Sequence, residues 1–222
     1  MSDTEVLPAV EVTTGPAPER AVIWLHGLGA DGHDFEPLVP ELGLELAVRF
    51  VFPHAPERPV TLNQGYRMRA WYDITGLDRR ALQDEAGIRQ SADQVEALIA
   101  REIARGVPAE RIVLAGFSQG GAIALYAGLR RREPLAGVMA LSTYLPLEQA
   151  FLQERAPGSA AVPVFMAHGS ADPVLAVSLG EHSRDLLQTL GYPVEWRAYP
   201  MGHQVCLEEV RAIAEWLARV LT

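Results

Sequence analysis

The sequence predicts an α/β fold built on a mainly parallel sheet, and three observations carry that prediction. Short apolar segments that suit buried strands alternate with longer segments of helical periodicity. The strand-like segments are nearly continuously apolar, which is typical of strands covered by helices on both faces. The chain has 222 residues and no internal repeat, low-complexity tract or linker. We therefore expect residues 1–222 to form one domain of this class.

The individual elements follow from the pattern in chain order. Buried strands are expected first, at 21–26 and at 49–52, and Pro53 ends the second. Residues 88–105 have one apolar helical face, and the Gly106–Pro108 stretch stops that helix. The later elements are expected as a strand at 111–115, a helix after Ser118, strands near 136–141 and 162–167, a helix around 178–190, a strand at 193–198 and a terminal helix.

The stretch from 53 to 84 is the longest one without clear periodicity. Connections of this length are often lids or binding loops. Its larger side chains are Leu62, Met68, Trp71, Tyr72 and Leu77.

Composition excludes several classes of function. The formal net charge of −9 argues against a nucleic-acid surface and against charge-driven binding to anionic membranes. Cys206 is the single cysteine, so an intramolecular disulfide is excluded and a cysteine metal site is not expected. Lysine is absent, which rules out Schiff-base chemistry, a Ser-Lys dyad and a phosphate-loop lysine. Neither a secretory signal nor an apolar run of membrane-spanning length is seen, so a cytoplasmic protein without integral membrane association is expected.

Residues 114–122, LAGFSQGGA, place Ser118 between a strand and a helix with a glycine two residues away on each side. This G-x-S-x-G pattern is the signature of a nucleophile elbow. The serine backbone there adopts a strained conformation, and side chains larger than glycine would collide as the chain reverses. In this setting Ser118 is predicted to be a nucleophile.

A serine hydroxyl needs a base, and His203 is the candidate among six histidines. It follows the last expected strand and precedes the terminal helix, where a hydrolase of this kind carries its histidine in the order serine, acid, histidine. The other histidines suit strand ends, a helix start, a turn and a solvated helix, and they are His26, His168, His33, His54 and His182.

The acid that orients the histidine should lie between Ser118 and His203. Asp172 follows the strand at 162–167, where it could fix the imidazole tautomer and stabilise the imidazolium. The other acids considered are less well placed, because two lie in a helix and one follows three arginines at a helix end; they are Glu181, Asp185 and Glu133.

The oxyanion that forms during attack needs two hydrogen-bond donors. One is expected to be the backbone N–H of Gln119, directly after the nucleophile. The other is expected from the loop after the strand at 21–25, where the glycines of His26-Gly27-Leu28-Gly29 let the backbone come close. The N–H of Leu28 is the candidate.

Together these segments resemble the small bacterial carboxylesterases that group with acyl-protein thioesterases and lysophospholipases of the α/β-hydrolase fold. The matching segments cover almost the whole chain, and they are WLHGLG at 24–29, PHAP at 53–56, MRAWYD at 68–73, GFSQGG at 116–121, STYLP at 142–146, HG at 168–169, DPV at 172–174 and MGH at 201–203. Thr143, where some relatives carry glycine, is a minor departure.

The resemblance implies an α/β-hydrolase fold without a helical cap domain and a triad of Ser118, Asp172 and His203. It also implies an acyl site lined by the loop at 68–73. The candidate substrate-binding residues are Met68, Trp71, Tyr72 and Leu77. Trp71 and Tyr72 suit core packing equally well. Members of the family often pair as homodimers, which would make a homodimer a possible assembly.

The predicted reaction is the hydrolysis of short- to medium-chain carboxylic esters, small molecules, through an acyl-enzyme on Ser118, without cofactor or metal. The alternative is an acyl-protein or acyl-CoA thioesterase or lysophospholipase with the same triad. A dienelactone-type hydrolase is disfavoured because its relatives tend to use cysteine, and Cys206 lies elsewhere. A non-catalytic binding protein is disfavoured because no triad member is missing.

Overall fold

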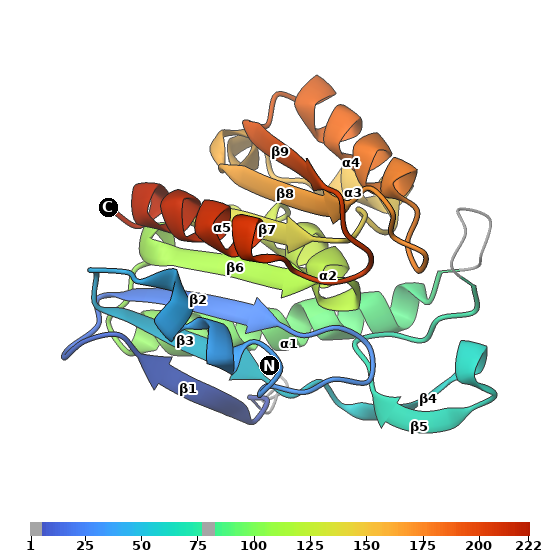
Figure 1. The fold of residues 1–222 in the computed structure, drawn as a ribbon, viewed down its shortest axis with the longest axis horizontal. Helices are drawn as coiled ribbons and strands as arrows, with labels where there is room; N and C mark the ends of the chain where they lie inside the picture. The colour runs from blue at the N-terminus through green and yellow to red at the C-terminus, as the bar shows by residue number, and fades with distance from the viewer. Residues whose placement is uncertain (1–5, 77–82) are drawn as a thin grey trace.

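The protein is built on one seven-stranded sheet in the order β1-β3-β2-β6-β7-β8-β9 (Figure 1). The computed structural model describes residues 6–76 and 83–222. The strands are β1 (Ala9–Thr13), β2 (Arg20–Leu25), β3 (Val48–Pro53), β6 (Ile112–Phe117), β7 (Gly137–Leu141), β8 (Val164–Gly169) and β9 (Val194–Tyr199). Every neighbouring pair is parallel except β1 with β3. The predicted mainly parallel α/β-hydrolase sheet is confirmed.

Helices cover both faces of this sheet, as predicted. On one face α1 (Glu85–Ala104) and α2 (Gln119–Gly128) pack into an apolar core that Leu187 of α4 (Val177–Thr189) joins. On the other face α5 (Leu207–Val220) packs into a second core with Trp24, Phe50 and Phe165. Figure 1 shows α5 crossing one side of the sheet while α1 and α2 lie on the other. No helical cap domain interrupts the part of the chain that the structure describes.

The stretch from 53 to 84, which shows no clear periodicity in the sequence, contains an antiparallel hairpin that was not predicted. Strands β4 (Glu57–Val60) and β5 (Tyr66–Arg69) pair as a separate two-stranded sheet beyond the end of the main sheet (Figure 1). Both strands are short and largely solvent-facing, so neither carries the apolar run by which buried strands are recognised.

Two further elements were not predicted. Strand β1 is an edge strand whose residues are exposed or half-buried, and α3 (Glu148–Glu154) has only seven residues and one buried side chain, Phe151. Both are too short and too exposed for a clear periodic signal. In the described residues, no helix combines the length and apolar character needed to cross a bilayer.

Parallel strands deliver their carboxyl ends to one edge of the sheet, and the candidate site lies there. The turns that follow β2, β6, β8 and β9 carry, respectively, the segment around Leu28, Ser118, Asp172 and His203. This edge is where open α/β sheets bind ligands.

Candidate active site

Ser118 occupies a sharp turn between β6 and α2 that only glycine neighbours allow. Its backbone has φ 54° and ψ −120°, a strained conformation for a residue with a side chain. A Cβ added to Gly116 would lie 2.3 Å from the backbone of Gly120, and one added to Gly120 would lie 2.5 Å from the carbonyl oxygen of His26. The steric reason for the glycine pattern is therefore visible in the structure.

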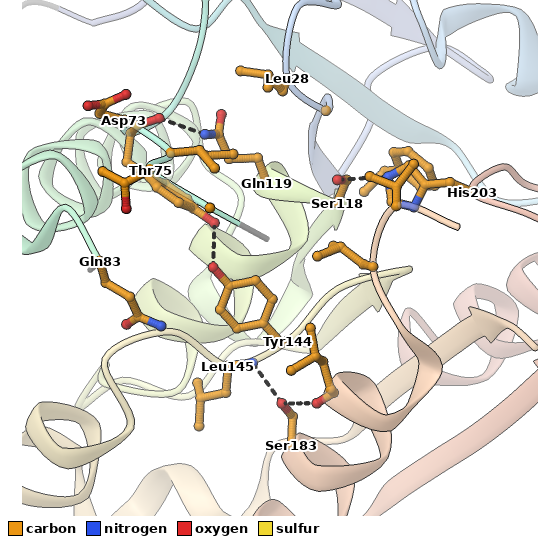
Figure 2. Close-up of a pocket in the computed structure, with 18 of the residues that line it drawn as sticks. Leu28, Asp73, Thr75, Gln83, Ser118, Gln119, Tyr144, Leu145, Ser183 and His203 are labelled. Carbon is orange, nitrogen blue, oxygen red and sulfur yellow. Dashed lines mark hydrogen bonds between the residues drawn. The ribbon is translucent and has the colours of Figure 1, made fainter. Parts of the chain in front are cut away.

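The structure brings Ser118, His203 and Asp172 into one hydrogen-bonded relay. The Ser118 Oγ lies 2.9 Å from His203 Nε2, and His203 Nδ1 lies 2.7 Å from Asp172 Oδ2. The ring of Phe117 packs against the imidazole with ring centroids 4.8 Å apart, which restricts how the histidine can rotate. In Figure 2 the His203 ring points directly at the Ser118 hydroxyl.

The Asp172 carboxylate is held in place by the backbone of its own turn. Its side chain is fully buried, and Oδ1 accepts hydrogen bonds from the backbone N–H groups of Val174 (2.8 Å) and Leu175 (2.9 Å). Burial alone would raise the pKa of Asp172, but the hydrogen bonds from His203 and from these two N–H groups lower that pKa below its usual value. The acid is thus ionised, and its Oδ2, which also lies 3.5 Å from His168 Nε2, contacts the imidazole of His203.

Two other buried histidines hold backbone rather than face the serine. His26 Nδ1 lies 2.7 Å from the Gly27 carbonyl, and its Nε2 accepts from the N–H of Ala55 at 3.1 Å. Burial lowers the pKa of His26 to about 4, so the ring is neutral. His168 Nε2 lies 2.9 Å from the Leu175 carbonyl, and burial lowers the pKa of His168 as well. These contacts agree with the structural roles expected for both rings.

Leu28 and Gln119, whose backbone N–H groups are the expected oxyanion donors, both line the cavity beside Ser118. Within the described residues, no hydrogen bond uses either N–H. Figure 2 shows Leu28 and Gln119 on the side of Ser118 away from His203. Gln119 is the first residue of α2, so its N–H also carries the positive end of the helix dipole. The structure thus brings both expected donor residues to the same side of the nucleophile.

The cavity next to Ser118 has a volume of about 490 Å³, within the usual range for small-molecule sites. Of the four residues predicted to line an acyl site, Tyr72 does so. Trp71 is fully buried in the core beneath the wall, and Met68 lies on β5 near Gly29, outside the lining. Leu77 lies outside the described residues.

Much of the cavity wall comes from segments that the sequence did not single out as pocket-forming. Tyr144 and Leu145 follow β7, and α4 contributes Leu179, His182 and Ser183. The two segments are joined, because the N–H of Leu145 donates to Ser183 Oγ at 2.9 Å. The spacing of those α4 residues, i, i+3 and i+4, puts them on one helix face. This shared face is the one feature of the sequence that could have indicated that they line the same surface. His182, expected to be solvated, instead lines the cavity and lies 2.7 Å from Glu148 Oε2.

The other candidate acids lie apart from the relay. Asp185 is exposed and pairs with the neighbouring Arg184 at 2.8 Å, and Glu133 lies 3.8 Å from Arg131. No group of three or more His, Cys, Asp or Glu side chains in the described ranges could hold a metal ion. The arrangement suits nucleophilic acyl transfer: an oriented hydroxyl, a base in contact with it, a buried acid and two unused N–H groups.

A family profile described as Phospholipase/Carboxylesterase matches residues 8–221. The chain is 45% identical over 211 residues to acyl-protein thioesterase 1 of Neurospora crassa, covering 90% of this chain and 86% of the relative. It is 41% identical over 225 residues to acyl-protein thioesterase 1 of Mycosarcoma maydis, covering 94% of each. The crystal structure of Arabidopsis thaliana SOBER1 superposes with a TM-score of 0.87 at 30% identity, covering 91% of this chain and 99% of that one. Both curated relatives are fungal, so they do not support the bacterial grouping expected from the sequence.

Proposed function

The chain belongs to the phospholipase/carboxylesterase family and is a carboxylic ester hydrolase, and from this premise we propose that it is a thioesterase that removes acyl chains from proteins. The observation that carries the proposal is the Ser118–His203–Asp172 relay at the wall of a cavity large enough for an acyl chain. The identity to two acyl-protein thioesterases supports the thioester over the simple ester as substrate. The ester activity predicted first from the sequence is the second candidate, and the family description favours it.

The proposed mechanism has two acyl-transfer steps. His203 takes the proton of Ser118 as its Oγ attacks the thioester carbonyl, and the N–H groups of Leu28 and Gln119 stabilise the oxyanion. The intermediate collapses to an acyl-enzyme, and the imidazolium gives its proton to the departing thiolate. Water, deprotonated by His203, then attacks the acyl-enzyme and releases the fatty acid. Asp172 holds the imidazole in the tautomer that both steps need.

The charge of the cavity supports a protein-linked leaving group over coenzyme A. Three acidic residues are among those that line it, Asp34, Asp73 and Glu148, and none of its described lining residues is an arginine. The sequence has no lysine and a formal net charge of −9. The phosphates of coenzyme A would meet this negative field without a cation to receive them.

The experiment compares one acyl chain on three leaving groups: a peptide cysteine, coenzyme A and p-nitrophenol. We expect kcat/KM for the acyl-peptide to exceed that for the acyl-CoA by about tenfold or more at low salt, because like charges slow the encounter. Added salt should narrow this gap by screening the repulsion. Asp34→Asn should raise kcat/KM for the acyl-CoA, whereas Glu36→Gln, a neighbouring acid outside the lining, should not.

An acyl-CoA that matches or exceeds the acyl-peptide at low salt would contradict the choice of leaving group. A p-nitrophenyl ester preferred to both thioesters of the same acyl chain would instead favour the second candidate. Hydrolysis of all three that persists in Ser118→Ala would contradict the mechanism itself.

A further inference from the structure

The loop that carries Leu28 is tied to a neighbouring segment on both sides of that residue. The N–H of Gly29 donates to the Arg69 carbonyl at 2.9 Å, and the indole Nε1–H of Trp71 donates to the His26 carbonyl at 2.9 Å. Leu28 lies between His26 and Gly29 in the chain. Its N–H is therefore aimed by two hydrogen bonds to a segment more than 40 residues away.

The same segment is tied to the helix that begins after the nucleophile. The side chain of Gln119 accepts a hydrogen bond from the N–H of Trp71 and donates one to the carbonyl of Tyr72, each at 2.7 Å. Figure 2 shows this side chain directed to the cavity wall and away from Ser118. Residues 69–72, here called the bridge segment, thus contact both elements that carry the oxyanion donors.

The groups that form these hydrogen bonds are buried, so the loss of any one bond would disturb the local structure. Gln119 is 3% exposed, His26 1% and Trp71 0%. Within the site, Trp71 uses its backbone N–H, its carbonyl and its indole N–H, the carbonyl accepting from Ser91 Oγ. A buried polar group that loses its partner has no water to replace it, so the local backbone has to shift or pay a desolvation cost.

We infer that the carboxamide of Gln119 and the indole N–H of Trp71 are positioning groups that set the spacing between the two oxyanion donors. The backbone N–H of Gln119 touches the reacting oxygen, whereas its side chain acts through the bridge segment on Leu28. Trp71, for which the sequence left a substrate contact and core packing equally open, is fully buried and acts from beneath the cavity wall. This inference rests on the proposed function, since it requires that the oxyanion hole acts in acyl transfer.

The decisive variant is Gln119→Met, which keeps the backbone N–H and the length of the side chain and removes both hydrogen bonds. We expect kcat to fall by about 10- to 100-fold, since losing one oxyanion donor outright costs 10²- to 10³-fold and a displaced donor costs less. KM should stay within about twofold, because the oxyanion exists only in the transition state. Affinity for an alkyl trifluoromethyl ketone, which forms a tetrahedral oxyanion on the serine, should fall by the same factor as kcat.

Two further variants separate positioning from general stability. Trp71→Phe removes the indole N–H and keeps the backbone ties, so kcat and ketone affinity should again fall together. Ser159→Ala removes buried hydrogen bonds to the Ala156 carbonyl and to the Tyr192 hydroxyl, each 2.7 Å long and remote from the site. It should lower Tm and leave kcat and ketone affinity unchanged.

The inference is overturned if Gln119→Met keeps kcat within threefold of the wild type. A loss of kcat with unchanged ketone affinity would overturn it equally, because the damage would then lie outside the oxyanion hole. The proposed function is judged separately: it fails if Ser118→Ala is active, whatever Gln119→Met does.

Discussion

Replacing Ser118 by alanine is expected to lower kcat for ester and thioester hydrolysis by about 10⁵- to 10⁶-fold, the scale on which serine proteases respond to loss of their nucleophile. The hydroxyl that lies 2.9 Å from His203 Nε2 is the atom that forms the acyl-enzyme in the proposed mechanism. The residual rate would come from substrate binding and from the oxyanion donors, which the change leaves in place. Steady-state hydrolysis of a p-nitrophenyl ester and of an acyl-peptide gives the two values of kcat.

Ser142 provides a matched control on the neighbouring strand. It follows β7, is fully buried and has φ 47°, so it shares with Ser118 a positive φ that is rare for a residue with a side chain. Its hydroxyl has no hydrogen-bond partner among the described residues. Ser142→Ala should therefore keep kcat within about threefold. Activity of Ser118→Ala within tenfold of the wild type would remove this residue from the mechanism.

The second large effect is expected at the acid. Asp172→Asn should lower kcat by about 10⁴-fold, as the same change does in a serine protease. An amide at this position can present its NH₂ group to His203 Nδ1, which would force the proton onto Nε2 and leave that nitrogen unable to accept from Ser118. The fold should survive, because the remaining amide oxygen of the asparagine can still accept hydrogen bonds from the N–H groups of Val174 and Leu175, as Asp172 Oδ1 does.

Two carboxylates in the nearby helix test whether the acid is assigned correctly. Glu181→Gln and Asp185→Asn are expected to keep kcat within twofold, because neither side chain hydrogen-bonds to His203. If kcat of either variant fell by 10³-fold or more while Asp172→Asn remained active, Asp172 would not be the acid that orients His203 in catalysis.

The features that sequence alone could predict are those encoded locally. The G-x-S-x-G pattern can be read from the chain itself, and the clash that confines Gly116 is with the nearby backbone of Gly120, although Gly120 is confined by the remote carbonyls of Leu25 and His26. The buried strands show continuous apolar runs. The placement of Asp172 and His203 could be predicted because parallel strands bring the turns after β8 and β9 to the same sheet edge as Ser118. The order of these turns along the chain therefore indicates which side chains lie close together in space.

The cavity wall could not be predicted in the same way, because it depends on packing between remote segments. A tryptophan in a long stretch without clear periodicity suits a substrate contact and core packing equally well. Only the packed structure shows that Trp71 is buried and donates its indole N–H to the His26 carbonyl, 45 residues earlier in the chain. His182 looks like a solvated helix residue until α4 is packed beside Glu148. Side chains of this kind acquire their roles only from the tertiary arrangement.

The central claim, acyl transfer through Ser118, is tested most directly by trapping the covalent intermediate. The enzyme is mixed with an activated acyl ester, quenched in acid within the first turnover, digested and analysed by mass spectrometry. The mechanism predicts that the peptide containing Ser118 gains the mass of one acyl group, that Ser118→Ala shows no such gain, and that the label disappears as turnover is completed. Rapid turnover without an acylated Ser118, or an acyl group found instead on Cys206, would contradict it.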